Sequence, residues 1–83
     1  MNEVWTYKYK DKEIKVTNGN YCTLALDGEL KVKKFGLLCC NLRCVLDSGE
    51  KVRAFIGGFW QIDCELIVDD YLLQPVKLHR PGR

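Results

Sequence analysis

The alternation of apolar and polar residues from Val52 to Val68 restricts the fold of this chain more than any other sequence feature. Each even-numbered position in this stretch except Gly58 carries an apolar side chain, which is the pattern of strands with one buried face. One unbroken strand of this length would extend for more than about 50 Å, roughly twice the width of so small a domain. The chain must therefore turn back, and we expect the turn at Gly57 and Gly58.

A three-residue loop at residues 57–59 is the version of this turn that keeps the apolar faces together. It pairs Ile56 with Trp60, whereas a two-residue turn would set Ala54 against Gln61. A shift of one residue moves every apolar side chain to the wrong face, so registers of only one parity are admissible. The same loop pairs Ala54 with Ile62 and Val52 with Cys64.

The loop Asp47-Ser48-Gly49 is predicted to join the first two strands of the same ribbon. A three-residue loop with a left-handed glycine suits this sequence. The ribbon is predicted to contain strands at residues 38–46, 50–56 and 60–68. The pairs predicted for its first hairpin are Leu46 with Glu50, Cys44 with Val52, Leu42 with Ala54 and Cys40 with Ile56.

Turn signals divide the first part of the chain in the same way. We expect a two-residue turn at residues 11–12, a turn at residues 18–20, and a three-residue loop at residues 26–28 with Gly28 in a β-bulge. The predicted pairs are Tyr9 with Ile14, Tyr7 with Val16, Lys10 with Glu13, Leu24 with Leu30 and Cys22 with Val32.

These patterns predict an all-β protein, with a single antiparallel meander of about seven or eight short strands that forms a β-sandwich or small barrel. Its 83 residues suffice for one domain. We expect a single β domain at residues 1–78, with a last strand after Asp69-Asp70 that ends at an edge near Pro75. Residues 79–83 are expected to form a flexible basic tail.

Composition excludes several functional classes. Hydrophobic residues make up 47% of the chain and charged residues 29%, as in globular chains rather than disordered or membrane ones. No uncharged run approaches the ~20 residues of a spanning helix, and residues 1–3 lead into no signal-like segment. We expect a cytoplasmic protein without a membrane partner.

The chain has five cysteines, at positions 22, 39, 40, 44 and 64. We expect reduced thiols that pack as small hydrophobic groups. The alternative is a thiol cluster of Cys40, Cys44 and Cys64, because the predicted register sets Val52 between two of them. The single histidine, His79, lies in the tail, so we expect no catalytic residue, cofactor or metal, and no enzyme activity.

Basic side chains on the strands, together with the basic tail, form a second candidate site, which would bind nucleic acid or another polyanion. Its members are Lys31, Lys33, Lys34, Arg43 and Arg53. Tyr21 and Phe55 are expected on the same face, where they could stack with unpaired bases. Acidic residues share that face, so cross-strand ion pairing is the alternative interpretation.

Several turn and core residues resemble those of a set of short, uncharacterised β-domain proteins from low-GC Gram-positive bacteria. The residues that carry the resemblance are Val4-Trp5-x-Tyr7, Gly28-Glu29-Leu30, Gly36-Leu37, Leu46-x-Ser48-Gly49-Glu50-x-Val52, Gly57-Gly58, Cys64 and Val68-Asp69-x-x-Leu72-Leu73-x-Pro75. The resemblance implies a bacterial cytosolic β-domain and no particular activity. The chain is also similar in strand and turn pattern to the β-sandwich of Fas apoptosis inhibitory molecules, which implies architecture alone.

We therefore expect a small non-enzymatic β module that binds a protein partner or a second copy of itself. Its high apolar fraction and the absence of a helical pattern favour contact through an edge strand or an apolar sheet face. The alternatives are polyanion binding by the basic residues and a thiol or metal site. Nothing in the sequence points to a small-molecule substrate.

Overall fold

The computed structural model describes residues 3–35, 40–58 and 61–80, and the regular structure of these residues is entirely β. They form two antiparallel sheets, sheet A with the order β4-β3-β2-β1-β9 and sheet B with the order β5-β6-β7-β8. The strands are β1 (Glu3–Tyr9), β2 (Lys12–Asn18), β3 (Tyr21–Leu26), β4 (Glu29–Phe35), β5 (Cys40–Val45), β6 (Lys51–Gly57), β7 (Asp63–Val68), β8 (Tyr71–Leu73) and β9 (Lys77–His79).

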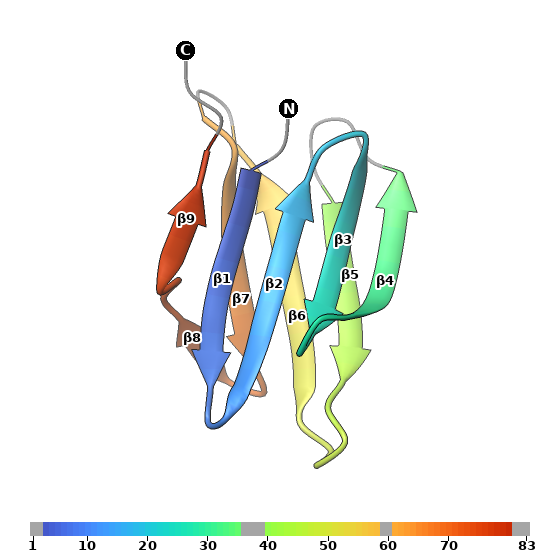
Figure 1. Ribbon diagram of the computed structural model, residues 1–83, viewed down its shortest axis with the longest axis vertical. Helices are drawn as coiled ribbons and strands as arrows, with labels where there is room; N and C mark the ends of the chain where they lie inside the picture. Colours follow the sequence, from blue (N-terminus) through green and yellow to red (C-terminus); the bar gives the residue numbers. More distant parts are fainter. Residues whose placement is uncertain (1–2, 36–39, 59–60, 81–83) are drawn as a thin grey trace.

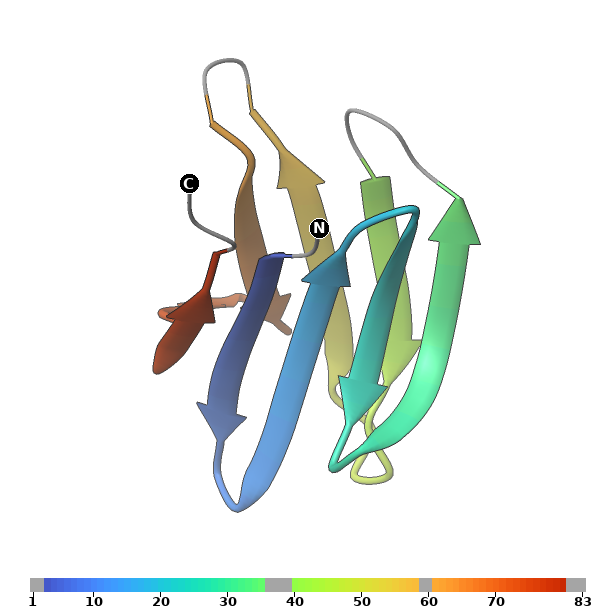
Figure 2. The ribbon, with the colours of Figure 1, turned by 45° about the horizontal axis from the view of Figure 1, so that its top comes forward.

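The two sheets lie face to face as the layers of a β-sandwich. Sheet A is in front of sheet B in Figure 1, and the tilted view in Figure 2 separates the layers. The predicted all-β fold is thus confirmed. The chain runs through β1–β4, crosses to sheet B for β5–β8, and returns to sheet A with β9 beside β1. The predicted meander of seven or eight strands did not include β9 or its pairing with β1. No helix within the described ranges is long and apolar enough to cross a membrane.

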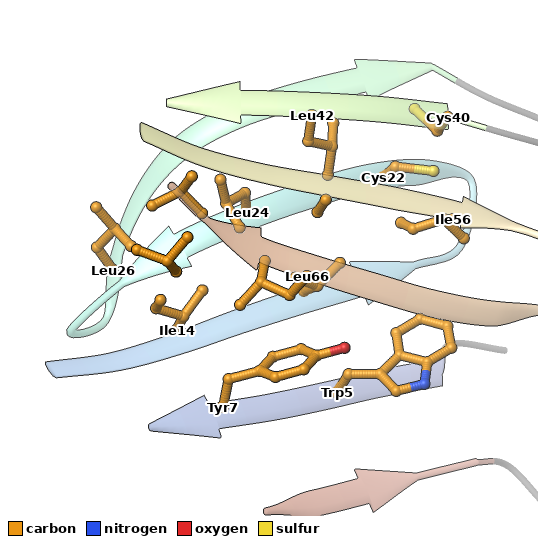
Figure 3. Close-up of a cluster of buried hydrophobic side chains, with 14 of the residues drawn as sticks. Trp5, Tyr7, Ile14, Cys22, Leu24, Leu26, Cys40, Leu42, Ile56 and Leu66 are labelled. Atoms are coloured by element: carbon orange, nitrogen blue, oxygen red, sulfur yellow. The ribbon is translucent and has the colours of Figure 1, made fainter. Parts of the chain in front are cut away.

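The core lies between the sheets, and Figure 3 shows side chains from both layers pointing into it. Odd-numbered side chains of β1 and even-numbered side chains of β2 point inward, because these strands pair residues of opposite parity, such as Trp5 with Val16. Burial of one large apolar side chain contributes about 1.5–3 kcal/mol. The largest fully buried side chains include Trp5, Tyr7, Ile14, Leu24, Leu42, Ile56 and Leu66.

The hairpin between β5 and β6 has the predicted register. Leu46 donates its amide hydrogen to the carbonyl of Glu50 at 2.9 Å, and Gly49 has the expected positive φ of 101°. The pairs along the ladder are Cys44 with Val52, Leu42 with Ala54 and Cys40 with Ile56.

The turn between β1 and β2 lies at residues 10–11, one residue earlier than predicted. Ile14 is therefore opposite Tyr7 rather than Tyr9, and Trp5 takes the place predicted for Tyr7 opposite Val16. Lys10, which was expected opposite Glu13, lies in the turn with a φ of 55°. The two registers differ by two residues in pairing and keep the same faces together, so parity alone could not distinguish them.

The hairpin between β3 and β4 combines a tight turn with a bulge, and the predicted pairs are wrong. Asp27 and Gly28 have φ values of 49° and 83°, as in a two-residue type I′ turn. The register then shifts between Leu24 and Ala25. Next to the turn, Leu26 is opposite Glu29. Beyond the bulge, Leu24 is opposite Val32 and Cys22 is opposite Lys34, so apolar residues are paired again at Leu24.

The loop after β6 is longer than the predicted three residues. Ile56 is opposite Cys64, Ala54 is opposite Leu66 and Val52 is opposite Val68. The partners are four residues later than predicted, although their parity is the same, and Trp60 lies outside the described residues. A Cβ atom on Gly58 would collide with the carbonyl oxygen of Gln61, so glycine is required where the loop begins.

The last part of the chain joins both sheets. Asp69-Asp70 forms the predicted turn into the edge strand β8, and Pro75 lies between β8 and β9. β9 ends at His79, one residue beyond the expected boundary of the β domain. Arg80 then donates to the carbonyl of Ile62 in sheet B's connecting loop at 2.7 Å. Residues 81–83 lie outside the described residues.

Candidate functional site

The five basic residues of the predicted polyanion site lie on three sides of the sandwich. Lys33 is on the outer face of sheet A, whereas Arg43 and Arg53 are on the outer face of sheet B. Lys34 donates to a main-chain carbonyl of β5 at 2.9 Å, and Lys31 lies 3.3 Å from a carboxylate of its own strand. The structure therefore does not bring the five together on one face.

The predicted thiol cluster is also rearranged. Cys40 and Cys64 are the two cross-strand neighbours of Ile56, but Cys44 is four residues from Cys40 along β5, at ~13 Å. Cys22 of sheet A approaches Cys40 from the opposite layer, and Figure 3 shows these two at the same end of the core. Sequence reasoning missed Cys22 because this contact depends on how the sheets pack.

The thiols of Cys22, Cys44 and Cys64 are poor nucleophiles. Burial, with a smaller contribution from a hydrogen bond with Cys40, raises the pKa of Cys22 to about 12, and burial raises that of Cys64 to about 11. Burial also raises the pKa of Cys44. The reactive form is the thiolate, which is scarce at neutral pH for such groups. Within the described residues, which exclude Cys39, no group of three or more His, Cys, Asp or Glu side chains could hold a metal ion.

Glu50 is the acceptor of a polar cluster that links the β1–β2 turn to the β5–β6 loop. Its carboxylate accepts hydrogen bonds from Tyr9 at 2.9 Å, from Lys10 at 3.3 Å and from Ser48. The bond from Ser48 and then that from Tyr9 are the main causes that lower the pKa of Glu50 to about 2. The cluster joins the two sheets.

The outer face of sheet B carries opposite charges on its two halves. We call residues Arg43, Lys51 and Arg53 of β5 and β6 the basic half. We call residues Asp63, Glu65, Asp69 and Asp70 of β7 and its following turn the acidic half. Exposed or half-buried apolar side chains lie between and beside them, namely Phe55, Ile67 and Leu72. A shallow hollow in this face is lined by residues that include Arg43, Arg53, Phe55 and Glu65.

Arg43 and Arg53 are directly opposite each other in the β5–β6 ladder. Hydrogen-bonded and non-hydrogen-bonded pairs alternate along an antiparallel ladder, and Leu46 and Glu50 form a hydrogen-bonded pair. Counting from there, Arg43 and Arg53 form a non-hydrogen-bonded pair. The side chains of such pairs approach each other most closely. Like charges in this position are destabilising. Neither arginine forms an ion pair with any residue that the structure describes.

The outer face of sheet A is basic and has an aromatic corner. Lys8, Lys15, Lys33 and Lys77 project from it, together with His79, and Glu13 is opposite Lys8. At the corner, Tyr21 and Phe35 form an edge-to-face pair with ring centroids 5.8 Å apart. Sequence reasoning did not place Lys77 and His79 on this face, because a strand of three residues has too little alternation to be recognised.

Comparison of the chain with protein-family models, with curated proteins and with solved structures finds no match to any of them.

Proposed function

We propose that the protein is a non-enzymatic β module of a bacterial cytosol that self-associates through the outer faces of sheet B. The opposition of Arg43 and Arg53 carries this proposal, because two unneutralised cations at closest approach call for an acidic partner. The free thiols of Cys22, Cys40, Cys44 and Cys64 support a reducing compartment.

A second copy supplies the matching charges. A two-fold rotation about an axis along the strands, between β6 and β7, places β5 and β6 of one copy over β8 and β7 of the other. The basic half of each copy then faces the acidic half of its partner. Complementary potentials of this kind orient an interface and suppress incorrect pairings.

The residues between the charges are those of an interface core. Phe55 is 44% exposed and Leu72 is 54% exposed, and aromatic residues and arginine are enriched where interfaces are buried. If each copy buries about a tenth of its 5775 Å² of surface, the interface totals roughly 1,150 Å², near the lower limit for a specific contact. We therefore expect a weak, salt-sensitive dimer.

The strand edges are less suitable for self-association. β4 is an edge of sheet A, and pairing two copies of it would bring together Lys31, Lys33 and Lys34 of both. Lysines on edge strands are a known means of preventing such pairing. β5, the edge of sheet B beside β4, has a main-chain carbonyl that accepts a hydrogen bond from Lys34. The remaining edge strands, β8 and β9, have three residues each.

Sedimentation equilibrium over a range of protein and salt concentrations tests the proposal. Arg53→Glu and Glu65→Arg each place like charges across the interface, so each should weaken the dimer about tenfold or more. The variant with both substitutions restores the complementary pattern in both copies and should dimerise nearly as well as the unmodified chain. Lys15→Glu, on the outer face of sheet A, is the matched control and should have no effect.

A chain that stays monomeric at millimolar concentration would refute the proposal. So would single variants that dimerise normally, or a double variant that is no better than either single variant.

A further inference from the structure

The outer face of sheet A is more basic than the nearly neutral chain suggests, because nearby acids are engaged elsewhere. Glu3 accepts a hydrogen bond from Asn18 at 2.9 Å, and Glu29 is 3.3 Å from Lys31. Asp27 accepts the backbone amide hydrogen of Glu13 at 2.7 Å. Among the residues that the structure describes, Glu13 is thus the one acid whose strand position is on this face, and it is opposite Lys8.

Three lysines remain without an acid opposite them. Lys15 and Lys77 are the two cross-strand neighbours of Thr6 on either side of β1. Lys33 of β4 is opposite Thr23 of β3. The five strands of sheet A span about 19 Å between the axes of β9 and β4. The lysines therefore lie across the width of the sheet, with a shallow hollow between β2 and β9 lined by residues that include Thr6, Lys15 and Lys77.

The aromatic corner offers exposed rings for stacking, an interaction that the binding of a simple anion would not use. Phe35 is 68% exposed and Tyr21 is 47% exposed. The ammonium of Lys33 lies 4.5 Å from the centroid of the Tyr21 ring. Two exposed rings beside a cation on a flat sheet provide stacking surfaces for bases and a partner for the adjoining phosphate.

We infer that the outer face of sheet A binds single-stranded nucleic acid. Bases stack on the Phe35 and Tyr21 rings, and the phosphates follow Lys33, Lys15 and Lys77 across the sheet. Single strands fit this surface because their bases are free to stack, whereas paired bases in a duplex are not. The inference does not depend on the proposed dimer, because the outer faces of the two sheets are on opposite sides of the sandwich and both can be occupied at once.

Fluorescence anisotropy with a labelled oligothymidine of about twelve nucleotides tests the inference, with a duplex of equal length and labelled heparin as the comparison ligands. We expect the oligothymidine to bind more tightly than the duplex in about 50 mM salt. For three contacted phosphates, log affinity should fall against log salt concentration with a slope of about −2, and Lys15→Gln or Lys77→Gln should each reduce this slope by about 0.7.

Phe35→Ala separates stacking from charge. It should weaken oligothymidine binding by about fivefold or more, and it should leave heparin binding unchanged because heparin has no bases. Lys31→Gln is the matched control, because this lysine is on the same strand as Lys33 but is paired with Glu29, and it should have little effect. Circular dichroism checks that each variant is folded.

Absence of oligothymidine binding in low salt would overturn the inference. Equal binding of the duplex, or loss of heparin and oligothymidine binding together in Phe35→Ala, would also overturn it. An effect of Lys31→Gln as large as that of Lys15→Gln would show that binding does not occur on this face.

Discussion

The hydroxyl of Tyr9 in sheet A donates a hydrogen bond at 2.9 Å to the carboxylate of Glu50, in the β5–β6 loop of sheet B. Lys10 and Ser48 donate to the same carboxylate, whose side chain is only 13% exposed. Two hairpins that are 40 residues apart in the sequence are thereby joined at one end of the sandwich. The link depends on the ionised form of Glu50, which makes it sensitive to acid.

Acid should weaken the fold in a range set by Glu50. Its pKa is lowered from 4.5 to about 2 in the folded chain, so its contribution is fully present above pH 4.5 and is lost as the pH falls toward 2. Thermal unfolding followed from pH 6 to pH 2 should show this loss. Glu50→Gln should be less stable than the unmodified chain near pH 6 and should approach it at the acidic end. Parallel curves for the two proteins would contradict the assignment.

Reversing one charge of the arginine pair should stabilise the isolated subunit. Arg53→Glu converts a repulsive cross-strand pair into an attractive one, which is worth about 0.2–1 kcal/mol. The melting temperature should rise by about 1–8 °C for a chain of this size. Dilute protein, monitored by tryptophan fluorescence, keeps this effect separate from dimerisation, and Arg53→Gln should give an intermediate value. A lower melting temperature for Arg53→Glu would be the contrary result.

Alkylation should reveal how strongly the fold suppresses thiol reactivity. Cys22 is 1% exposed and has a pKa of about 12, so at pH 8 its thiolate fraction is roughly a thousandfold or more below that of a free cysteine. Mass spectrometry after iodoacetamide treatment should show much slower modification of Cys22 in the native protein than in denaturant. Equal rates in the two conditions would show that this end of the core opens readily.

Two glycines should respond differently to asparagine. Gly28 has a φ of 83° with open space around it, so Gly28→Asn should cost less stability than Gly28→Ala, because asparagine tolerates the left-handed conformation. At Gly58 any Cβ collides with the carbonyl of Gln61, so both substitutions should be strongly destabilising. Urea denaturation measures all four variants. Recovery by Gly58→Asn would mean that the loop adapts to a side chain.

The sequence allowed prediction of an all-β fold and of the buried faces of its strands, but not of every register or of the choice between a sandwich and a barrel. The Asp47–Gly49 loop was predictable because its turn chemistry and its apolar faces agree. At the β1–β2 turn and after Gly57, registers two or four residues apart preserve the same faces, and pairing parity does not separate them. At the β1–β2 turn, the observed register allows Tyr9 and Lys10 to donate to Glu50 on the other sheet.

The two candidate surfaces also differ in how far the sequence predicts them. The opposition of Arg43 and Arg53 follows from the predicted register of β5 and β6, which the structure confirms. The basic face of sheet A could not be predicted from the strand registers, because it requires β9. β9 has three residues, and its place beside β1 depends on the path of the whole chain. The contact of Cys22 with Cys40 likewise needs the packing of one layer on the other.

The pairing of β9 with β1 has a consequence for biosynthesis. Trp5 and Leu78 are opposite each other although they are 73 positions apart, and the amide of Val76 also bonds to the carbonyl of Thr6 at 2.7 Å. On a ribosome, β1 emerges before β9 and therefore keeps one side unpaired until residues 76–79 have been made. During that interval the nascent chain presents an open strand to its neighbours, and a premature stop after β8 would make this exposure permanent.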